Sequence, residues 1–146
     1  MTAFVDSSAL VKLYVPEPGY TDVRALSAAL AISQLARIEV PAAFWRKYRI
    51  GELRAEDARL LTSAFEVAYS GGVHVRPRFG VVMVTTDLLD EAARLVAVHP
   101  LRAYDSVQLA SAILARRASQ SPLQFMSFDR ALREAASAEG LPVVPV

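Results

Sequence analysis

Short apolar segments alternate with helical patterns along this chain of 146 residues. Strands are expected where apolar or β-branched residues form brief runs, at 3–5, 31–33, 81–85, 123–128 and, as an extended sheet edge, 141–146. Helices are expected where apolar residues recur three and four positions apart, at 9–14, 20–30, 35–49, 55–69, 87–98, 103–118 and 130–138. This alternation predicts an α/β fold, with a mainly parallel central sheet and helices on both faces.

Three local signals refine this prediction. Pro41 lies inside the helix expected at 35–49 and lacks an amide hydrogen, so it should kink that helix or mark where its regular part begins. Thr85 or Thr86 can cap the helix that follows the strand at 81–85. The glycine-rich segment 71–80 is expected to be a loop or a weak edge strand.

Size and composition are typical of one globular domain spanning residues 1–146. Hydrophobic residues make up 53% of the chain and charged residues 21%, the opposite of the balance in disordered proteins. The absence of cysteine excludes disulfides, thiolate metal sites and cysteine nucleophiles. No apolar run approaches the roughly 20 residues of a membrane span, and no basic region precedes Asp6 as in a signal peptide. We therefore expect a cytoplasmic protein without a membrane segment.

Four acidic residues far apart in the chain stand at comparable places in this pattern. Asp6 and Asp129 each follow an expected strand, Asp105 lies at the start of the helix 103–118, and Glu39 lies on a largely apolar helical face. Ligands of parallel sheets bind beyond the carboxyl ends of the strands, so at least two of these acids should face one crevice. Convergent carboxylates suit a hard divalent cation such as Mg²⁺, which prefers oxygen ligands. Without the cation their mutual repulsion should raise the pKa of at least one of them.

Each acid also has a purely structural interpretation. Asp6, Asp105 and Asp129 could be helix N-caps, a role in which aspartate is common. Glu39 could form a salt bridge with Arg46, two turns further along the same helix.

Other catalytic chemistries lack the residues they require. A nucleophilic serine would need a histidine base, and a nucleotide-binding enzyme would need a glycine-rich phosphate loop. The two histidines have no suitable setting and no such loop is present.

The net charge of +1 does not identify a binding partner. Basic residues do gather locally, at 46–54, 74–78 and 116–117. Such clusters beside an acidic metal site would suit a polyanion held by its phosphates, and they would equally suit ordinary solvated surface.

Four stretches, in this order, resemble the PIN domain family and more narrowly the VapC-type toxins of bacterial toxin–antitoxin pairs. They are Phe4–Tyr14, Ser33–Glu39, Leu101–Ala110 and Phe125–Leu132. The resemblance covers essentially the whole chain. It implies a PIN-like fold and a Mg²⁺- or Mn²⁺-dependent endoribonuclease that hydrolyses phosphodiester bonds in RNA. It also implies a homodimer that is inhibited by a small VapB-type antitoxin encoded alongside it.

The resemblance also implies roles for individual residues. Asp6 and Asp105 match the principal metal ligands of the family, and Glu39 and Asp129 match the other two acids of its catalytic quartet. Ser127 stands where the family often has a hydroxyl residue that steadies the site by hydrogen bonding. Pro41, just past Glu39, departs from the family pattern.

Two other functions remain compatible with these residues. One is a PIN nuclease that matures RNA and has no antitoxin. The other is a catalytically silent module that binds RNA or protein, with the four acids serving as caps and salt-bridge partners.

Overall fold

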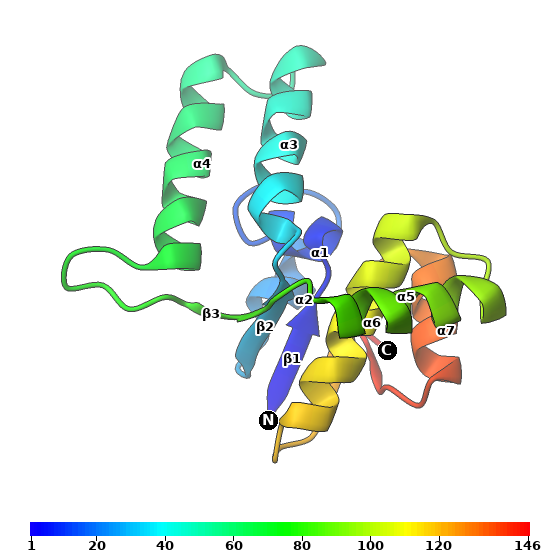
Figure 1. Cartoon of the computed structure of the whole chain (residues 1–146). Coiled ribbons are helices and arrows are strands. Elements are labelled where there is room, and N and C mark those ends of the chain that lie inside the picture. The colour runs from blue at the N-terminus through cyan, green and yellow to red at the C-terminus, as the bar shows by residue number, and fades with distance from the viewer.

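The computed structural model describes all residues from 1 to 146 and is built on a five-stranded, fully parallel sheet (Figure 1). The strands are β1 (Thr2–Val5), β2 (Ala29–Ser33), β3 (Phe79–Val82), β4 (Leu123–Met126) and β5 (Val143–Val144). Their order across the sheet is β3-β2-β1-β4-β5, so the first strand of the sequence lies in the middle. Phe4 in β1 aligns with Ala31 of β2 on one side and with Phe125 of β4 on the other.

Seven helices surround the sheet. They are α1 (Ser7–Val11), α2 (Tyr20–Arg24), α3 (Ala36–Arg49), α4 (Ala55–Ser70), α5 (Thr86–Val98), α6 (Ala103–Ala118) and α7 (Arg130–Ala138). Figure 1 shows α3 and α4 side by side as a pair that projects away from the sheet, whereas α5, α6 and α7 gather at its other side. The predicted α/β fold with a parallel sheet is confirmed.

The alternation of side chains along the strands divides the interior into two cores. Ala3 and Val5 of β1 face α1 to α4, in a core that contains Phe44 and Phe65. Phe4, between them in the sequence, faces α5, α6 and α7 and stacks on Phe125 of β4, with ring centroids 5.8 Å apart. Both faces of the sheet are therefore covered, as the continuous apolar character of its strands requires.

Strands β2 and β3 differ from their predicted positions because hydrogen bonding to neighbouring strands outweighs the local pattern of apolar residues. The helix expected at 20–30 ends at Arg24, since Ala29 and Leu30 join β2 and pair with Thr2 and Ala3 of β1. The strand expected at 81–85 lies two residues earlier, in register with β2 from Phe79 onward. Before this strand, a bridge between residues 72 and 75 closes a turn, and the edge strand β3 begins at Phe79. Both structures expected within 71–80, a loop and an edge strand, therefore occur.

Other expected elements agree more closely. Helices α6 and α7 have the predicted bounds, and Thr85 caps α5 by accepting a hydrogen bond from the amide of Leu88. Pro41 does not mark the start of α3, which begins five residues earlier at Ala36 and continues to Arg49. No helix combines the length and apolar character needed to cross a membrane.

Candidate acidic site

Asp6 lies directly after β1, where its carboxylate is almost completely buried. Oδ1 accepts a hydrogen bond of 2.8 Å from the amide of Ala9, so Asp6 is the N-cap of α1. Oδ2 accepts a hydrogen bond of 2.5 Å from Oγ of Ser127, which follows β4. One carboxylate thus starts a helix and joins the ends of two adjacent strands.

Asp129 lies on the same side of the sheet, three residues after β4. Its Oδ1 accepts a hydrogen bond of 2.8 Å from the amide of Leu132, which makes Asp129 the N-cap of α7. Its own amide donates to Oγ of Ser127 at 3.1 Å. Ser127 therefore links Asp6 and Asp129, and the structural role as a cap holds for both acids. A cap uses one carboxylate oxygen in each case, so it leaves capacity for another ligand.

Asp105 and Glu39 have different surroundings. Asp105 does not cap α6, whose N-cap is Arg102, and its Oδ2 lies 3.8 Å from Nε of that exposed arginine. Glu39, in the first turn of α3, accepts hydrogen bonds at Oε1 from Oγ of Ser7 at 3.0 Å and from Nε2 of Gln108 at 2.7 Å. The salt bridge with Arg46 considered from the sequence does not form.

The electrostatics place all four acids within one interacting group. Burial raises the pKa of Asp6 to about 6; hydrogen bonds from Ser127 and Ala9 oppose this rise, and the negative charges of Asp105 and Asp129 add to it. Burial also raises the pKa of Asp105, which Asp129 raises further. The pKa of Glu39 is raised by burial and, to a smaller extent, by Asp105. Proton uptake or a cation would relieve this accumulation of negative charge.

The donor set fits a divalent cation in charge and in chemistry. All four groups offer carboxylate oxygen, the ligand that Mg²⁺ and Mn²⁺ prefer, and no lysine pairs with any of them. No three acidic or histidine side chains converge closely enough to form a closed metal-binding group on their own. Mg²⁺ usually keeps several waters and binds only one or two protein carboxylates, so it does not require such a closed group.

Two residues important to this arrangement were not assigned a role from the sequence. Ser7 and Gln108 hold Glu39, and Gln108 Nε2 also donates to Oγ of Ser7 at 2.9 Å. Oε1 of Gln108 is buried without a hydrogen-bond partner. A signal was present: Gln108 is a polar residue in the buried stretch of α6, three positions after Asp105 and so on a neighbouring part of the same helical face.

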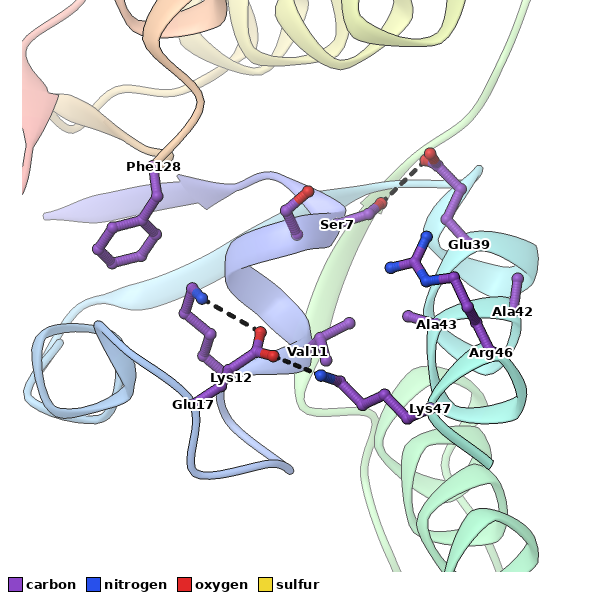
Figure 2. Close-up of a pocket in the computed structure, with 11 residues that line it drawn as sticks. Ser7, Val11, Lys12, Glu17, Glu39, Ala42, Ala43, Arg46, Lys47 and Phe128 are labelled. Carbon is purple, nitrogen blue, oxygen red and sulfur yellow. Dashed lines mark hydrogen bonds and ion pairs between the residues drawn. The ribbon is translucent and has the colours of Figure 1, made fainter. Parts of the chain in front are cut away.

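A cavity of about 330 Å³ adjoins the acidic site between α1 and α3. Figure 2 shows Ser7 and Glu39 at one end of it and three linked side chains, Lys12, Glu17 and Lys47, at the other. Glu39, one of the four acids, and a group of cations therefore share one depression of the surface.

Similarity to known proteins agrees with this fold. The model of the PIN domain family matches residues 3–138. The crystal structure of PAE2754 from Pyrobaculum aerophilum is 26% identical, with a TM-score of 0.61 over 99% of this chain and 84% of that chain. No protein with a curated description matches the sequence.

Two further solved structures share the fold at lower identity. FitAcB from Neisseria gonorrhoeae is 14% identical, with a TM-score of 0.62 over 98% of this chain and 96% of that chain. A toxin–antitoxin complex from Klebsiella pneumoniae is 19% identical, with a TM-score of 0.58 over the same shares of the two chains. With its parallel sheet and a family match over nearly its whole length, the chain belongs to the PIN domain family, whose members are generally nucleases.

Proposed function

We propose that this chain is a divalent-metal-dependent endoribonuclease and the toxin of a type II toxin–antitoxin pair. The observation that carries the proposal is the acidic group at the carboxyl ends of β1 and β4, where Asp6 and Asp129 share the hydroxyl of Ser127. Asp105 and Glu39 extend this group from α6 and α3. Four interacting carboxylates with little compensating positive charge are suited to binding a cation, and a bound cation can in turn bind a phosphodiester.

In the proposed reaction Asp6, Asp105 and Asp129 hold Mg²⁺ or Mn²⁺, and Glu39 helps to position the metal and the attacking water. The cation would supply positive charge that lowers the pKa of a water and offsets charge on the phosphate. The protein contributes orientation: Ser127 and the amide of Ala9 fix both oxygens of Asp6. Ser7 and Gln108 fix one oxygen of Glu39 and leave the other free to accept a hydrogen bond from water.

A direct test is incubation of the purified protein with RNA and Mg²⁺, with EDTA and the variant Asp6→Asn as controls. Asparagine retains an oxygen that can cap α1, so the variant should fold. We expect cleavage that disappears with EDTA and in the variant. Cleavage that survives both would exclude the proposed site.

The toxin assignment rests on the resemblance to VapC-type proteins and on the fold shared with the Klebsiella pneumoniae toxin–antitoxin complex. A VapB-type antitoxin and a homodimeric state belong to the same proposal. Induction of the chain alone should arrest growth, and co-expression of a small protein encoded beside it should restore growth. Cleavage without growth arrest would instead favour a nuclease of RNA maturation.

One observation favours a second candidate function, a module that binds RNA or protein without cutting. Asp6 and Asp129 both serve as caps, and the acids do not form a closed metal-binding group as they stand. A module of this kind should show no saturable effect of Mg²⁺ or Mn²⁺ on its melting temperature, whereas the proposed enzyme should be stabilised by either ion.

A further inference from the structure

The cavity beside the acidic site carries more positive than negative charge. Its lining contributes three cations, from Lys12, Arg46 and Lys47, and two carboxylates, from Glu17 and Glu39. Glu39 belongs to the acidic site, where Ser7 and Gln108 hold it. The lining away from that site therefore has three cations and one carboxylate, and Glu52, which does not line the cavity, also pairs with Lys47 at 3.2 Å.

The two lysines are held in place instead of extending freely into solvent. Nζ of Lys47 lies 2.6 Å from Oε2 of Glu17, and Nζ of Lys12 lies 3.1 Å from its Oε1. The two lysine side chains are only 12% and 13% exposed. Nζ of Lys12 also lies 5.0 Å from the centre of the Phe128 ring. Their positions are thus set before any ligand arrives, which lowers the entropy cost of binding one.

Arg46 supplies a third cation and has no counterion. It takes part in none of the ion pairs of the protein. Figure 2 shows its guanidinium group directed away from α3 into the cavity, between Glu39 and the lysines. A guanidinium group can bind phosphate through two parallel hydrogen bonds.

We propose that this cavity binds a backbone phosphate of the RNA close to the phosphodiester that is cleaved. The inference rests on the proposed function and adds to it the residues that position the substrate. The cavity and the acidic site share Ser7 and Glu39, so a strand that enters one reaches the other. Glu17 and Glu52 together balance the two lysines, so Arg46 remains the uncompensated cation, and a polyanion supplies the missing negative charge. Glu17 competes with the phosphate for the lysines and so limits the affinity for RNA.

The alternative is that Lys12, Glu17 and Lys47 only hold α1, the following loop and α3 together. The two interpretations predict opposite effects for Glu17→Gln. Loss of a structural link lowers the melting temperature and leaves RNA affinity unchanged or weaker. Removal of a competing charge tightens RNA binding even if the melting temperature falls.

Binding is measured by fluorescence anisotropy with a labelled single-stranded RNA and Asp6→Asn protein, over a range of salt concentrations. Introducing Arg46→Gln into the Asp6→Asn protein should weaken RNA binding about fivefold. It should also reduce the slope of log affinity against log salt concentration by about 0.7. Adding Glu17→Gln should tighten binding and make that slope steeper. The control is Arg59→Gln, which removes an exposed arginine of α4 that forms no ion pair; it should leave affinity and slope close to those of the parent.

Cleavage assays with the same substitutions separate this inference from the proposed function. With Asp6 intact, Arg46→Gln should raise KM and leave kcat nearly unchanged, because the proposed contact is to a neighbouring phosphate and not to the reacting one. If RNA is cleaved but Arg46→Gln and Glu17→Gln both behave like Arg59→Gln, the phosphate site is overturned and the proposed function stands. If Arg46→Gln weakens RNA binding but no metal-dependent cleavage occurs, the phosphate site stands and the proposed function is overturned.

Discussion

Oγ of Ser127 lies 2.5 Å from Oδ2 of Asp6, although 121 positions separate the two residues in the sequence. The contact joins the ends of β4 and β1, the two strands whose pairing brings Met126 beside Val5. Burial raises the pKa of Asp6, and the hydrogen bond from Ser127 is the largest of the effects that lower it. The charge state of the most buried acid in the site thus depends on a hydroxyl group from another strand.

Replacing Ser127 with alanine should weaken metal binding and stability together. The change leaves Oδ2 of buried Asp6 without its donor, which costs about 1–3 kcal/mol of the free energy of unfolding. It should also raise the pKa of Asp6 and so reduce the fraction that is ionised at neutral pH. Urea unfolding and titration with Mn²⁺ measure the two effects. Ser127→Thr, which keeps the hydroxyl, should lie close to the parent, and equal losses in both variants would argue against the hydrogen bond as the cause.

The stability of the metal-free protein should fall as pH rises from about 4 to about 6. Asp6 has a higher pKa in the folded chain than in the unfolded chain, so in this range the folded state binds more protons, and raising the pH favours unfolding. Because one pKa unit corresponds to about 1.4 kcal/mol, this single group costs on the order of 3 kcal/mol once it is fully ionised.

Thermal melting in EDTA at pH 5 and pH 7.5 measures this loss. Asp6→Asn has no charge to bury, so its melting temperature should change less between the two pH values. The same pH dependence in Asp6→Asn would assign the effect to other groups.

Replacing Gln108 with alanine should impair cleavage more than it impairs folding. Gln108 donates to Oε1 of Glu39, and a group that orients a ligand in this way typically changes activity or metal affinity about 10–100-fold. The pKa of Glu39 should rise as well, because this hydrogen bond helps to lower it. A pH profile of kcat, displaced to higher pH in the variant, would identify the positioning role.

A matched control for this prediction lies one turn along the same helix. Ser111 is buried in α6 like Gln108, but its hydroxyl donates to the carbonyl of Val107 within the helix. Ser111→Ala should leave the pH profile of cleavage unchanged. A displaced profile in this control would mean that any disturbance of α6 reaches Glu39.

Replacing Gly19 with alanine should destabilise the protein and disturb the cavity wall. Gly19 has φ = 92°, in the left-handed region, and an added Cβ would lie 2.6 Å from Cε1 of Phe128. A strained backbone residue of this kind costs about 1–3 kcal/mol, before the ring is displaced. Chemical unfolding gives the loss of stability. Gly51→Ala, at φ = 83° with no atom near the added Cβ, separates backbone strain from the clash with Phe128.

The class of fold and several elements could be predicted from the sequence alone. The bounds of α6 and α7 could be predicted because their signals are local: apolar residues at helical spacing, with Asp129 placed to cap α7. The parallel sheet followed from the alternation of strands and helices. Asp6 and Asp129 could be placed near each other because the carboxyl ends of parallel strands lie at one edge.

The exact strand bounds and the side-chain partners of the acids depend on how the elements pack against one another. Ala29 and Leu30 fit a helical pattern, yet they extend β2 because backbone hydrogen bonding to β1 and burial of Leu30 outweigh helix propensity. The side-chain partner considered for Glu39 from the sequence was Arg46 on its own helix, whereas Glu39 in fact accepts a hydrogen bond from Gln108, 69 positions away. Side-chain partners of this kind depend on the distances between packed elements, which no local periodicity encodes. The acids could therefore be proposed as site residues from the sequence, whereas the groups that hold them could not.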